Sequence, residues 1–277
     1  MKFAICFARI ISTRCKGSGS MKVENERWGH IPLLHVYKES EKDIQVPVVI
    51  FLHGFTSAKE HNLHYAYQLA EKGFRILLPD AHLHGERQEP LDEVQLSLRF
   101  WETILTSIEE INILRNELIN RNIISGDTKI GLAGTSMGGI ITLGCLNVYP
   151  WIDTAAVMMG SPGYVQLAKA QMSQFESRGF KLPITDIERK QMFETLRKFD
   201  ITLNPNKLNG RPIFFWHGMQ DNVVPYEPTF NFFNALKKSY VDDPQRFQFM
   251  TDKTASHAVS RKGMLASTDF IAHYLSE

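Results

Sequence analysis

One serine of this chain has the sequence surroundings of an activated nucleophile. Ser136 lies in the run GTSMG over residues 134–138, with an apolar strand predicted over residues 128–133 and an apolar helix over residues 139–148. A serine on a tight strand-to-helix turn exposes its hydroxyl at the helix N-terminus, and flanking glycines avoid clashes with strand and helix. The pattern predicts a nucleophilic serine on a strained turn.

A serine hydroxyl needs a base to take its proton, and the base needs a carboxylate that holds it in the correct tautomer. Asp221 and His257 are expected to supply these groups, because each follows a predicted strand. The order serine, acid, histidine is the one expected when the serine occupies such a turn. The rival acids lie in a helical insertion, before the last strand, or in a less suitable loop: Asp200, Asp242, Asp243 and Asp252.

The oxygen that becomes negatively charged during such a reaction needs two backbone N–H donors. We expect one donor from Met137, the residue after the serine, and the other from Phe55, in the loop after an early apolar strand. Gly54 allows that loop to turn sharply. His53 and His217 are predicted to hold their loops by hydrogen bonds rather than to act as bases.

A second group of polar residues has the spacing of a metal site: Asp80, His82, His84 and Glu86. No further histidine or cysteine at ligand spacing completes such a site, so we favour a hydrogen-bonded loop beside the active site. The sequence therefore predicts neither a metal ion nor an organic cofactor.

Alternating strands and helices must bring these groups together. We predict strands over residues 33–37, 46–52, 74–78, 128–133, 155–159, 211–216 and 246–251, and helices over residues 58–72, 91–120, 139–148, 226–238 and 260–275. Such alternation is typical of an α/β fold with a mostly parallel sheet covered by helices on both faces. In these sheets active groups gather at the carboxyl ends of the strands.

The segment over residues 161–210 interrupts the alternation, because it contains no convincing strand and has apolar residues at helical spacing. We interpret it as a helical cap inserted over the strand ends, with a pair of ordinary surface helices as the alternative. Tyr164, Met192 and Phe193 are the candidates in this segment for lining a pocket for the acyl group.

Composition excludes several classes of protein. The 277 residues include 31 Lys and Arg against 30 Asp and Glu, so no nucleic-acid partner is expected. No apolar stretch is long enough to cross a membrane. Three cysteines (Cys6, Cys15 and Cys145) are too few for a disulfide framework, which predicts a cytoplasmic protein. Cys145 is expected to be a small buried residue.

Residues 1–20 differ from the rest of the chain. They combine a short apolar run, interrupted by Arg9, with the linker-like sequence KGSGS over residues 16–20. We predict that they are a leader, a tag or the product of an upstream start codon, disordered and outside the fold. Residues 21–277 are then one domain, and no sequence feature indicates its oligomeric state.

The motifs together resemble those of the α/β-hydrolase superfamily. The matching segments are HGF (53–55), GTSMG (134–138), HGMQD (217–221) and His257. More closely, residues 21–277 resemble the YitV-like esterases of bacilli, relatives of prolyl-oligopeptidase-type and dienelactone-hydrolase-type domains, through HGFTSAKEHN (53–62), HGER (84–87) and GTSMGG (134–139). The resemblance implies an α/β-hydrolase fold and a serine hydrolase that acts on small carboxylic esters.

Two alternatives to an esterase stay open. The fold also suits a serine peptidase for small peptides, although the chain has no room for a large gating domain. A non-catalytic receptor for small molecules is the other alternative, and against it stands the complete set of serine, histidine and acid, which a receptor does not need.

Overall fold

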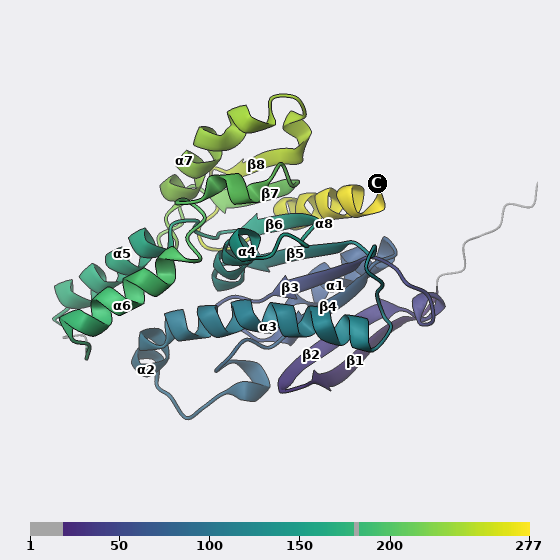
Figure 1. Cartoon of the computed structure of the whole chain (residues 1–277), viewed down its shortest axis with the longest axis horizontal. Helices are drawn as coiled ribbons and strands as arrows, with labels where there is room; N and C mark the ends of the chain where they lie inside the picture. Colours follow the sequence, from purple (N-terminus) through teal and green to yellow (C-terminus); the bar gives the residue numbers. More distant parts are fainter. Residues whose placement is uncertain (1–18, 180–182) are drawn as a thin grey trace, which may run out of the picture.

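The computed structural model describes residues 19–179 and 183–277, and the predicted leader lies almost entirely outside this part of the chain. The described residues build an eight-stranded sheet in the order β1-β2-β4-β3-β5-β6-β7-β8 (Figure 1). Only the β1–β2 and β2–β4 pairs of this sheet are antiparallel. The strands are β1 (Met21–Trp28), β2 (Ile31–Lys38), β3 (Val48–Leu52), β4 (Arg75–Pro79), β5 (Ile130–Thr135), β6 (Thr154–Met158), β7 (Ile213–Gly218) and β8 (Phe247–Asp252).

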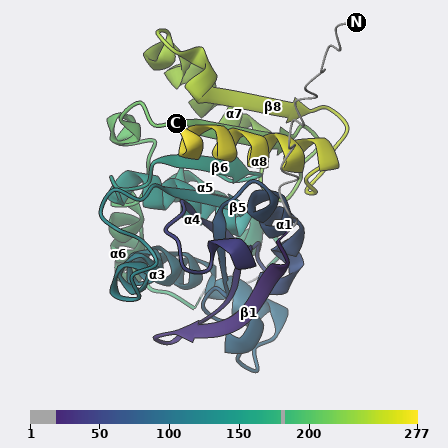
Figure 2. The same cartoon turned by 90° about the vertical axis from the view of Figure 1, so that its right-hand side faces the viewer.

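Helices cover both faces of the sheet, as predicted (Figures 1 and 2). One apolar cluster joins the sheet to α1 (Leu63–Glu71) and α8 (Arg261–Ser276). The other joins it to α3 (Phe100–Asn120), α4 (Met137–Val148) and α7 (Tyr226–Leu236). The central strands are buried on both sides, which explains their nearly uninterrupted apolar sequences. The predicted fold class is therefore confirmed.

Strand β1 was not predicted from the sequence. Its residues, MKVENERW, carry four charges and lack the alternation of apolar and polar side chains that identifies a half-buried strand. It forms because its backbone pairs with β2 along its whole length, from Met21 opposite Lys38 to Trp28 opposite Ile31. Charged side chains on an edge strand discourage further pairing with other chains.

The long helix predicted over residues 91–120 is in fact two helices, α2 (Glu93–Leu98) and α3, which meet at Arg99. The Arg99 guanidinium pairs with Glu89 and Glu102, which holds the chain at this break. Leu98 is consequently 42 % exposed instead of continuing the buried apolar stripe of α3. The break turns α2 toward the end of the sheet where the candidate site lies.

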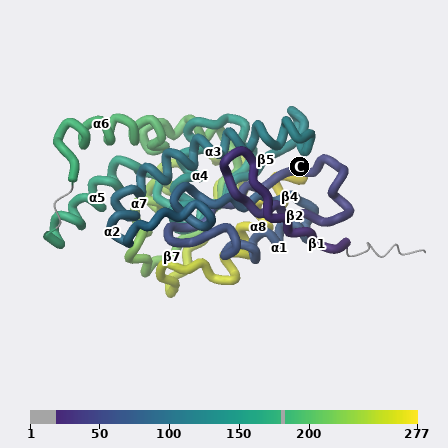
Figure 3. The backbone as a smooth tube through the Cα atoms, turned by 90° about the horizontal axis from the view of Figure 1, so that it is seen from below, coloured from purple at the N-terminus to yellow at the C-terminus, as the bar shows by residue number. Residues whose placement is uncertain are grey.

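The segment predicted as a cap contains two helices, α5 (Tyr164–Ser177) and α6 (Asp186–Arg197). Together with α2 they lie at one end of the molecule in two perpendicular views (Figures 1 and 3). Ala168 and Leu196 are fully buried in the core cluster, so both helices pack against the body of the protein. Among the helices that the structure describes, none combines the length and apolar character needed to cross a bilayer.

Candidate active site

Ser136 occupies the turn between β5 and α4 with φ 54° and ψ −117°. Residues other than glycine rarely adopt positive φ, and such strain is concentrated at functional sites. The backbone is held there because the Ser136 N–H donates to the carbonyl oxygen of Met158 on the neighbouring strand (2.8 Å). The predicted strained strand-to-helix turn is confirmed.

The glycines beside Ser136 allow the strand and the helix to approach each other. A Cβ atom added to Gly134 would collide with the backbone of Gly138, and one added to Gly138 would collide with the carbonyl oxygen of Leu52. These obstacles are backbone atoms, which cannot move aside as a flexible side chain can. The GTSMG run is therefore needed by the close packing of β3, β5 and α4.

We expect Gly138→Ala to lower the free energy of unfolding by at least about 2 kcal/mol, because the added methyl group overpacks the turn. Urea denaturation would measure the change. Gly126→Ala is the matched control, since the position is open and no atom lies within 4 Å of the added Cβ; we expect a change within about 0.5 kcal/mol. Equal effects of the two substitutions would contradict this account of the turn.

The structure brings Ser136, His257 and Asp221 into one chain of hydrogen bonds. The Nε2 atom of His257 lies 2.7 Å from the Oγ atom of Ser136, and its Nδ1 donates to Oδ2 of Asp221 over 2.7 Å. These residues are separated by 85 and 36 positions in the sequence, and each follows the carboxyl end of a strand (β5, β7 and β8). Such an arrangement can transfer the serine proton to the imidazole as the hydroxyl attacks.

Asp221 is buried and held by four donors. Its Oδ1 accepts hydrogen bonds from the N–H groups of Val223 and Val224 (2.9 Å each), and its Oδ2 faces His257 and, at 3.3 Å, the Nε2 of His217. Burial by itself would raise the pKa of this carboxyl, but the hydrogen bonds outweigh it and the pKa lies well below its ordinary value of 3.8. The group is thus a carboxylate at neutral pH.

His217 keeps the role predicted from the sequence. Its Nε2 donates to the carbonyl oxygen of Val224 (2.9 Å), which closes the loop that carries Asp221. The Nε2 proton also faces the Asp221 carboxylate. His217 thereby fixes the acid rather than the serine.

Two backbone donors lie beside the serine. Gly54 approaches Ser136 so closely that an added Cβ would lie 3.5 Å from the serine Cβ, which puts the Phe55 loop next to the hydroxyl. Met137 begins α4, so its N–H has no partner inside the helix. Within the described ranges, neither the Phe55 nor the Met137 N–H donates a hydrogen bond to a protein acceptor. Both remain available to a ligand oxygen.

His53 holds the loop of the first donor. Its Nε2 accepts from the Ala81 N–H (3.0 Å), and its Nδ1 donates to the Gly54 carbonyl oxygen (2.8 Å). Both bonds need a neutral imidazole with the proton on Nδ1. Burial lowers the pKa of His53 from 6.5 to about 4, so the ring is neutral at pH 7.

This depressed pKa predicts a loss of stability in mild acid. The unfolded chain binds a proton at His53 below about pH 6.5, whereas the folded protein does so only near pH 4. Lowering the pH through this window therefore favours unfolding, by up to about 1.4 kcal/mol per pH unit and about 3 kcal/mol in total. Urea midpoints measured between pH 7.5 and pH 4.5 should fall more steeply in the wild type than in His53→Gln. Parallel curves for the two proteins would refute this assignment.

The Asp80 to Glu86 segment is a hydrogen-bonded loop, as predicted. The ammonium group of Lys59, which is 1 % exposed, lies 2.9 Å from Oδ2 of Asp80 and 2.8 Å from Oε1 of Glu86. The Nδ1 of His84 donates to the carbonyl oxygen of His82 (2.9 Å). Burial by itself would lower the pKa of Lys59, but the hydrogen bonds that its ammonium group donates to these two carboxylates raise it, so Lys59 stays charged and offsets their negative charge.

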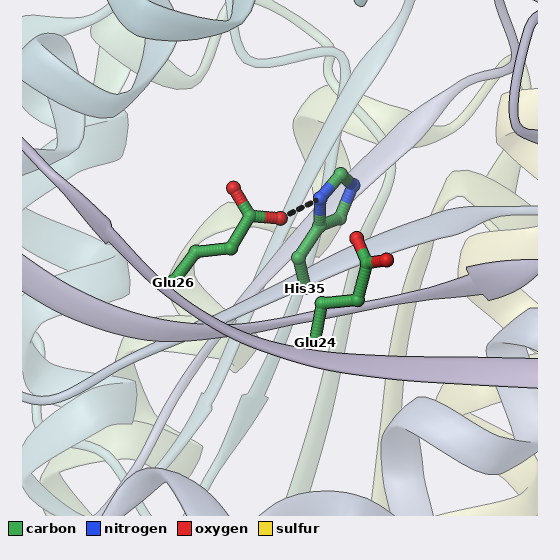
Figure 4. A group of neighbouring side chains, drawn as sticks. All are labelled: Glu24, Glu26 and His35. Carbon is green, nitrogen blue, oxygen red and sulfur yellow. Dashed lines mark hydrogen bonds and ion pairs between the residues drawn. The ribbon is translucent and has the colours of Figure 1, made fainter.

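Another acidic group lies on β1 and β2, where one atom from each of Glu24, Glu26 and His35 falls within 4.8 Å of the others (Figure 4). Its polar atoms already have protein partners. His35 donates from Nδ1 to Glu26 (2.8 Å) and accepts at Nε2 from the Arg75 guanidinium (3.0 Å), and Glu24 accepts from the Tyr37 hydroxyl (2.9 Å). We interpret the group as a hydrogen-bonded network, since a cation there would face Arg75.

A cavity of about 370 Å³ opens beside Ser136, among α2, α3, α5 and α6. Its walls are mostly apolar and include Phe55, Phe100, Trp101, Ile140, Leu167 and Met192. The sequence analysis did not name Phe100 and Trp101 as site residues, since both lie inside the single long helix expected over residues 91–120. The available signal was their position at the start of α3, beside the carboxyl ends of the strands.

Of the three cap residues predicted to line a pocket, the structure puts Met192 in the cavity wall and the other two elsewhere. Tyr164 is fully buried, and its hydroxyl donates to the Ile140 carbonyl oxygen (2.6 Å). Phe193, the next residue on α6, turns about 100° away and packs against the Lys169 ammonium group, 5.6 Å from the ring centre.

A mostly parallel sheet with a serine on a tight turn after a central strand, and an acid and a histidine after later strands, defines the α/β-hydrolase class. Residues 107–277 match the model of the prolyl oligopeptidase family. The chain belongs to this family of serine hydrolases.

Two relatives cover most of the chain. "Putative esterase YitV" of Bacillus subtilis (strain 168) is 46% identical over 92% of this chain and 100% of its own length. Esterase YjfP of Escherichia coli (strain K12) is 31% identical over 79% of this chain and 86% of its own. The solved structure of TT1662 from Thermus thermophilus has a TM-score of 0.71 at 21% identity, covering 93% of this chain and 99% of that one. This last likeness concerns the fold alone.

Proposed function

We propose that the protein is a carboxylesterase in which Ser136 is the nucleophile, His257 the general base and Asp221 its orienting acid. The observation that carries this proposal is the pair of 2.7 Å contacts that link the serine to the histidine and the histidine to the carboxylate. The names of the two relatives, both esterases, support carboxylic esters as the substrate class.

In the proposed acylation step, the Ser136 Oγ attacks the ester carbonyl carbon while its proton passes to Nε2 of His257. The carbonyl oxygen becomes an oxyanion, which accepts hydrogen bonds from the N–H groups of Phe55 and Met137. The intermediate then collapses, and the alcohol leaves with the proton from His257. Ser136 is left acylated.

Deacylation repeats the sequence with water as the nucleophile. His257 takes a proton from the water molecule as it attacks the acyl carbon, and the same N–H groups of Phe55 and Met137 stabilise the second oxyanion. Return of the proton to the Ser136 oxygen releases the carboxylic acid. The carboxylate of Asp221 stabilises the charged imidazole in both steps.

A fluorophosphonate probe tests the nucleophile directly, because it forms a covalent bond only with an activated serine. We expect one equivalent of label, located at Ser136 by peptide mass spectrometry, and hydrolysis of p-nitrophenyl acetate and butyrate. A panel of dipeptide amides run beside the esters would be cleaved much more slowly. Absence of labelling would instead support a non-catalytic receptor, and preferential amide cleavage would support a peptidase.

We also propose that the protein acts in the cytoplasm. This is supported by the small number of cysteines and by the free, buried thiol of Cys145, whose pKa is raised by burial so that it is an unreactive packing residue.

A further inference from the structure

One polar side chain in the cavity wall is held in a defined orientation. The indole Nε1 of Trp101 donates to Oε1 of Gln171 over 2.9 Å, and both residues line the cavity. Trp101 is itself fixed, because its ring packs against Phe100 and Tyr164 with centroid distances of 5.5 and 5.2 Å. The direction of its N–H group is therefore set by the surrounding rings.

This hydrogen bond determines which atom of the Gln171 amide, the oxygen or the nitrogen, is available to a ligand. An indole N–H is only a donor, so the amide oxygen must face it and the amide nitrogen must point elsewhere. In the part of the chain that the structure describes, no acceptor is bonded to the Gln171 Nε2 atom. The cavity wall thus offers the N–H donors of this amide, while the amide oxygen already accepts from the Trp101 indole.

The surroundings of the amide are suited to a flat apolar group. Phe55, Phe100 and Trp101 supply three aromatic faces or edges, and Leu167 and Met192 supply aliphatic contacts. A volume of about 370 Å³ is at the lower end for ligand pockets, which suits a group of about one substituted ring. Inside such walls a substrate oxygen that loses water needs a protein donor in its place.

Gln171 lies one turn of α5, about 5 Å, beyond Leu167 and Ala168 on the same helix face. Ala168 also lines the cavity, together with Ser136 and Ile140. The amide is therefore separated from the nucleophile by an apolar stretch of wall.

We propose that this cavity selects esters that carry an aryl group with a hydrogen-bond acceptor oxygen, and that the Gln171 Nε2 donates to that oxygen. The proposal rests on the proposed function, because the group must be attached to an ester cleaved at Ser136. Gln171 acts here as a specificity residue that contacts substrate away from the reacting atoms. The recognised feature is the acceptor oxygen of a carbonyl, ether or hydroxyl substituent.

Pairs of esters that match in shape and differ in the acceptor test the proposal. In one series, methyl esters of 4-acetylphenyl and 4-isopropylphenyl carboxylic acids carry spacers of two to four methylene groups, which insulate the ester from the electronic effect of the para substituent. In the other series, acetates of the corresponding alcohols place the ring on the leaving group. At the best spacer in one series we expect kcat/KM to be about threefold to tenfold higher for the acetyl compound, the range of a neutral hydrogen bond.

Two variants separate the donor from the rest of the wall. Gln171→Glu keeps an oxygen for the Trp101 N–H but offers no donor to the substrate. Gln171→Met removes both the acceptor oxygen and the N–H donor, and its side chain is similar in size to that of glutamine. In each variant we expect the acetyl to isopropyl ratio of kcat/KM to fall to about one, while the isopropyl esters are still hydrolysed. Because the ratio is taken within one protein, general effects of the substitution on turnover cancel.

This proposal would be overturned if the wild type hydrolysed the esters through Ser136 with an acetyl to isopropyl ratio of kcat/KM near one at every spacer. The proposed function would then remain intact. A preference for the acetyl compounds that persists in Gln171→Glu would also overturn it. Absence of any Ser136-dependent ester hydrolysis would overturn the proposed function and, with it, this inference.

Discussion

Ser136→Ala is expected to lower kcat/KM for a short p-nitrophenyl ester at least about 10³-fold while the protein stays folded. The substitution removes the atom that forms the acyl-enzyme, while the Phe55 and Met137 donors and the cavity remain. Alanine keeps the Cβ atom of serine and adds no bulk to the turn, so the fold should be unchanged. Initial rates with wild type and variant, together with circular dichroism and a urea midpoint, measure both parts of this expectation.

Ser239→Ala is the matched control, because this serine is exposed and lies in the short 3-10 helix Lys237–Tyr240, which precedes β8 and hence lies toward the opposite edge of the sheet. Its rate should agree with the wild type within about twofold. A Ser136→Ala protein that turns over the ester at an undiminished rate would show that another residue is the nucleophile.

Asp221→Asn is expected to lower kcat by about 10³- to 10⁴-fold, because the asparagine would favour the wrong histidine tautomer. The N–H groups of Val223 and Val224 both point at the present Oδ1, so the asparagine oxygen should stay with them. Its amide nitrogen then occupies the place of Oδ2 and donates to Nδ1 of His257. The proton is thereby held on Nε2, where the imidazole cannot accept the proton of Ser136.

The control for this change is Asp242→Asn, an exposed acid that precedes β8 and hence lies toward the opposite edge of the sheet. Its kcat should stay within about twofold of the wild type. The assignment of the acid would be wrong if Asp221→Asn retained more than a tenth of the wild-type kcat. Purified proteins should be compared at pH 7.5, where the carboxylate of Asp221 is ionised.

Two of the rival acids, Asp200 and Asp252, hold local structure by hydrogen bonds. Asp200 is buried, but its carboxylate accepts hydrogen bonds from the N–H of Val165 and from Thr202, so it holds the start of α5. Asp252 accepts from the N–H groups of Thr254 and Ala255, so it shapes the loop before His257. Neither makes a hydrogen bond to the imidazole of His257 in the described structure.

The fold was predictable from the sequence where apolar runs identified buried strands and the alternation of strands with helices implied that those strands are parallel. The buried runs of β3 and β5 identify central strands, and alternation with helices makes the sheet parallel. Because parallel strands end at one edge, the loops after β5, β7 and β8 had to meet there. This is why Ser136, Asp221 and His257 could be named together before their distances were known.

Other features could not be predicted from the local pattern of apolar and polar residues. Strand β1 has a polar sequence and forms by pairing with β2. The helix predicted over residues 91–120 breaks at Arg99, where ion pairs hold the turn. Tyr164 and Phe193 have the apolar character of pocket residues, yet one is buried under the cavity wall and the other turns toward Lys169.

The sequence by itself determined the nucleophilic turn, the order of the proposed triad and the α/β class, because these depend on local backbone sterics and on the direction of parallel strands. Only the tertiary structure decided the walls of the cavity and the orientation of Gln171. Those depend on how the start of α3 meets α5 at Trp101 and Gln171, which are 70 positions apart in the sequence. Side-chain packing between distant helices leaves no periodic signal in either of them.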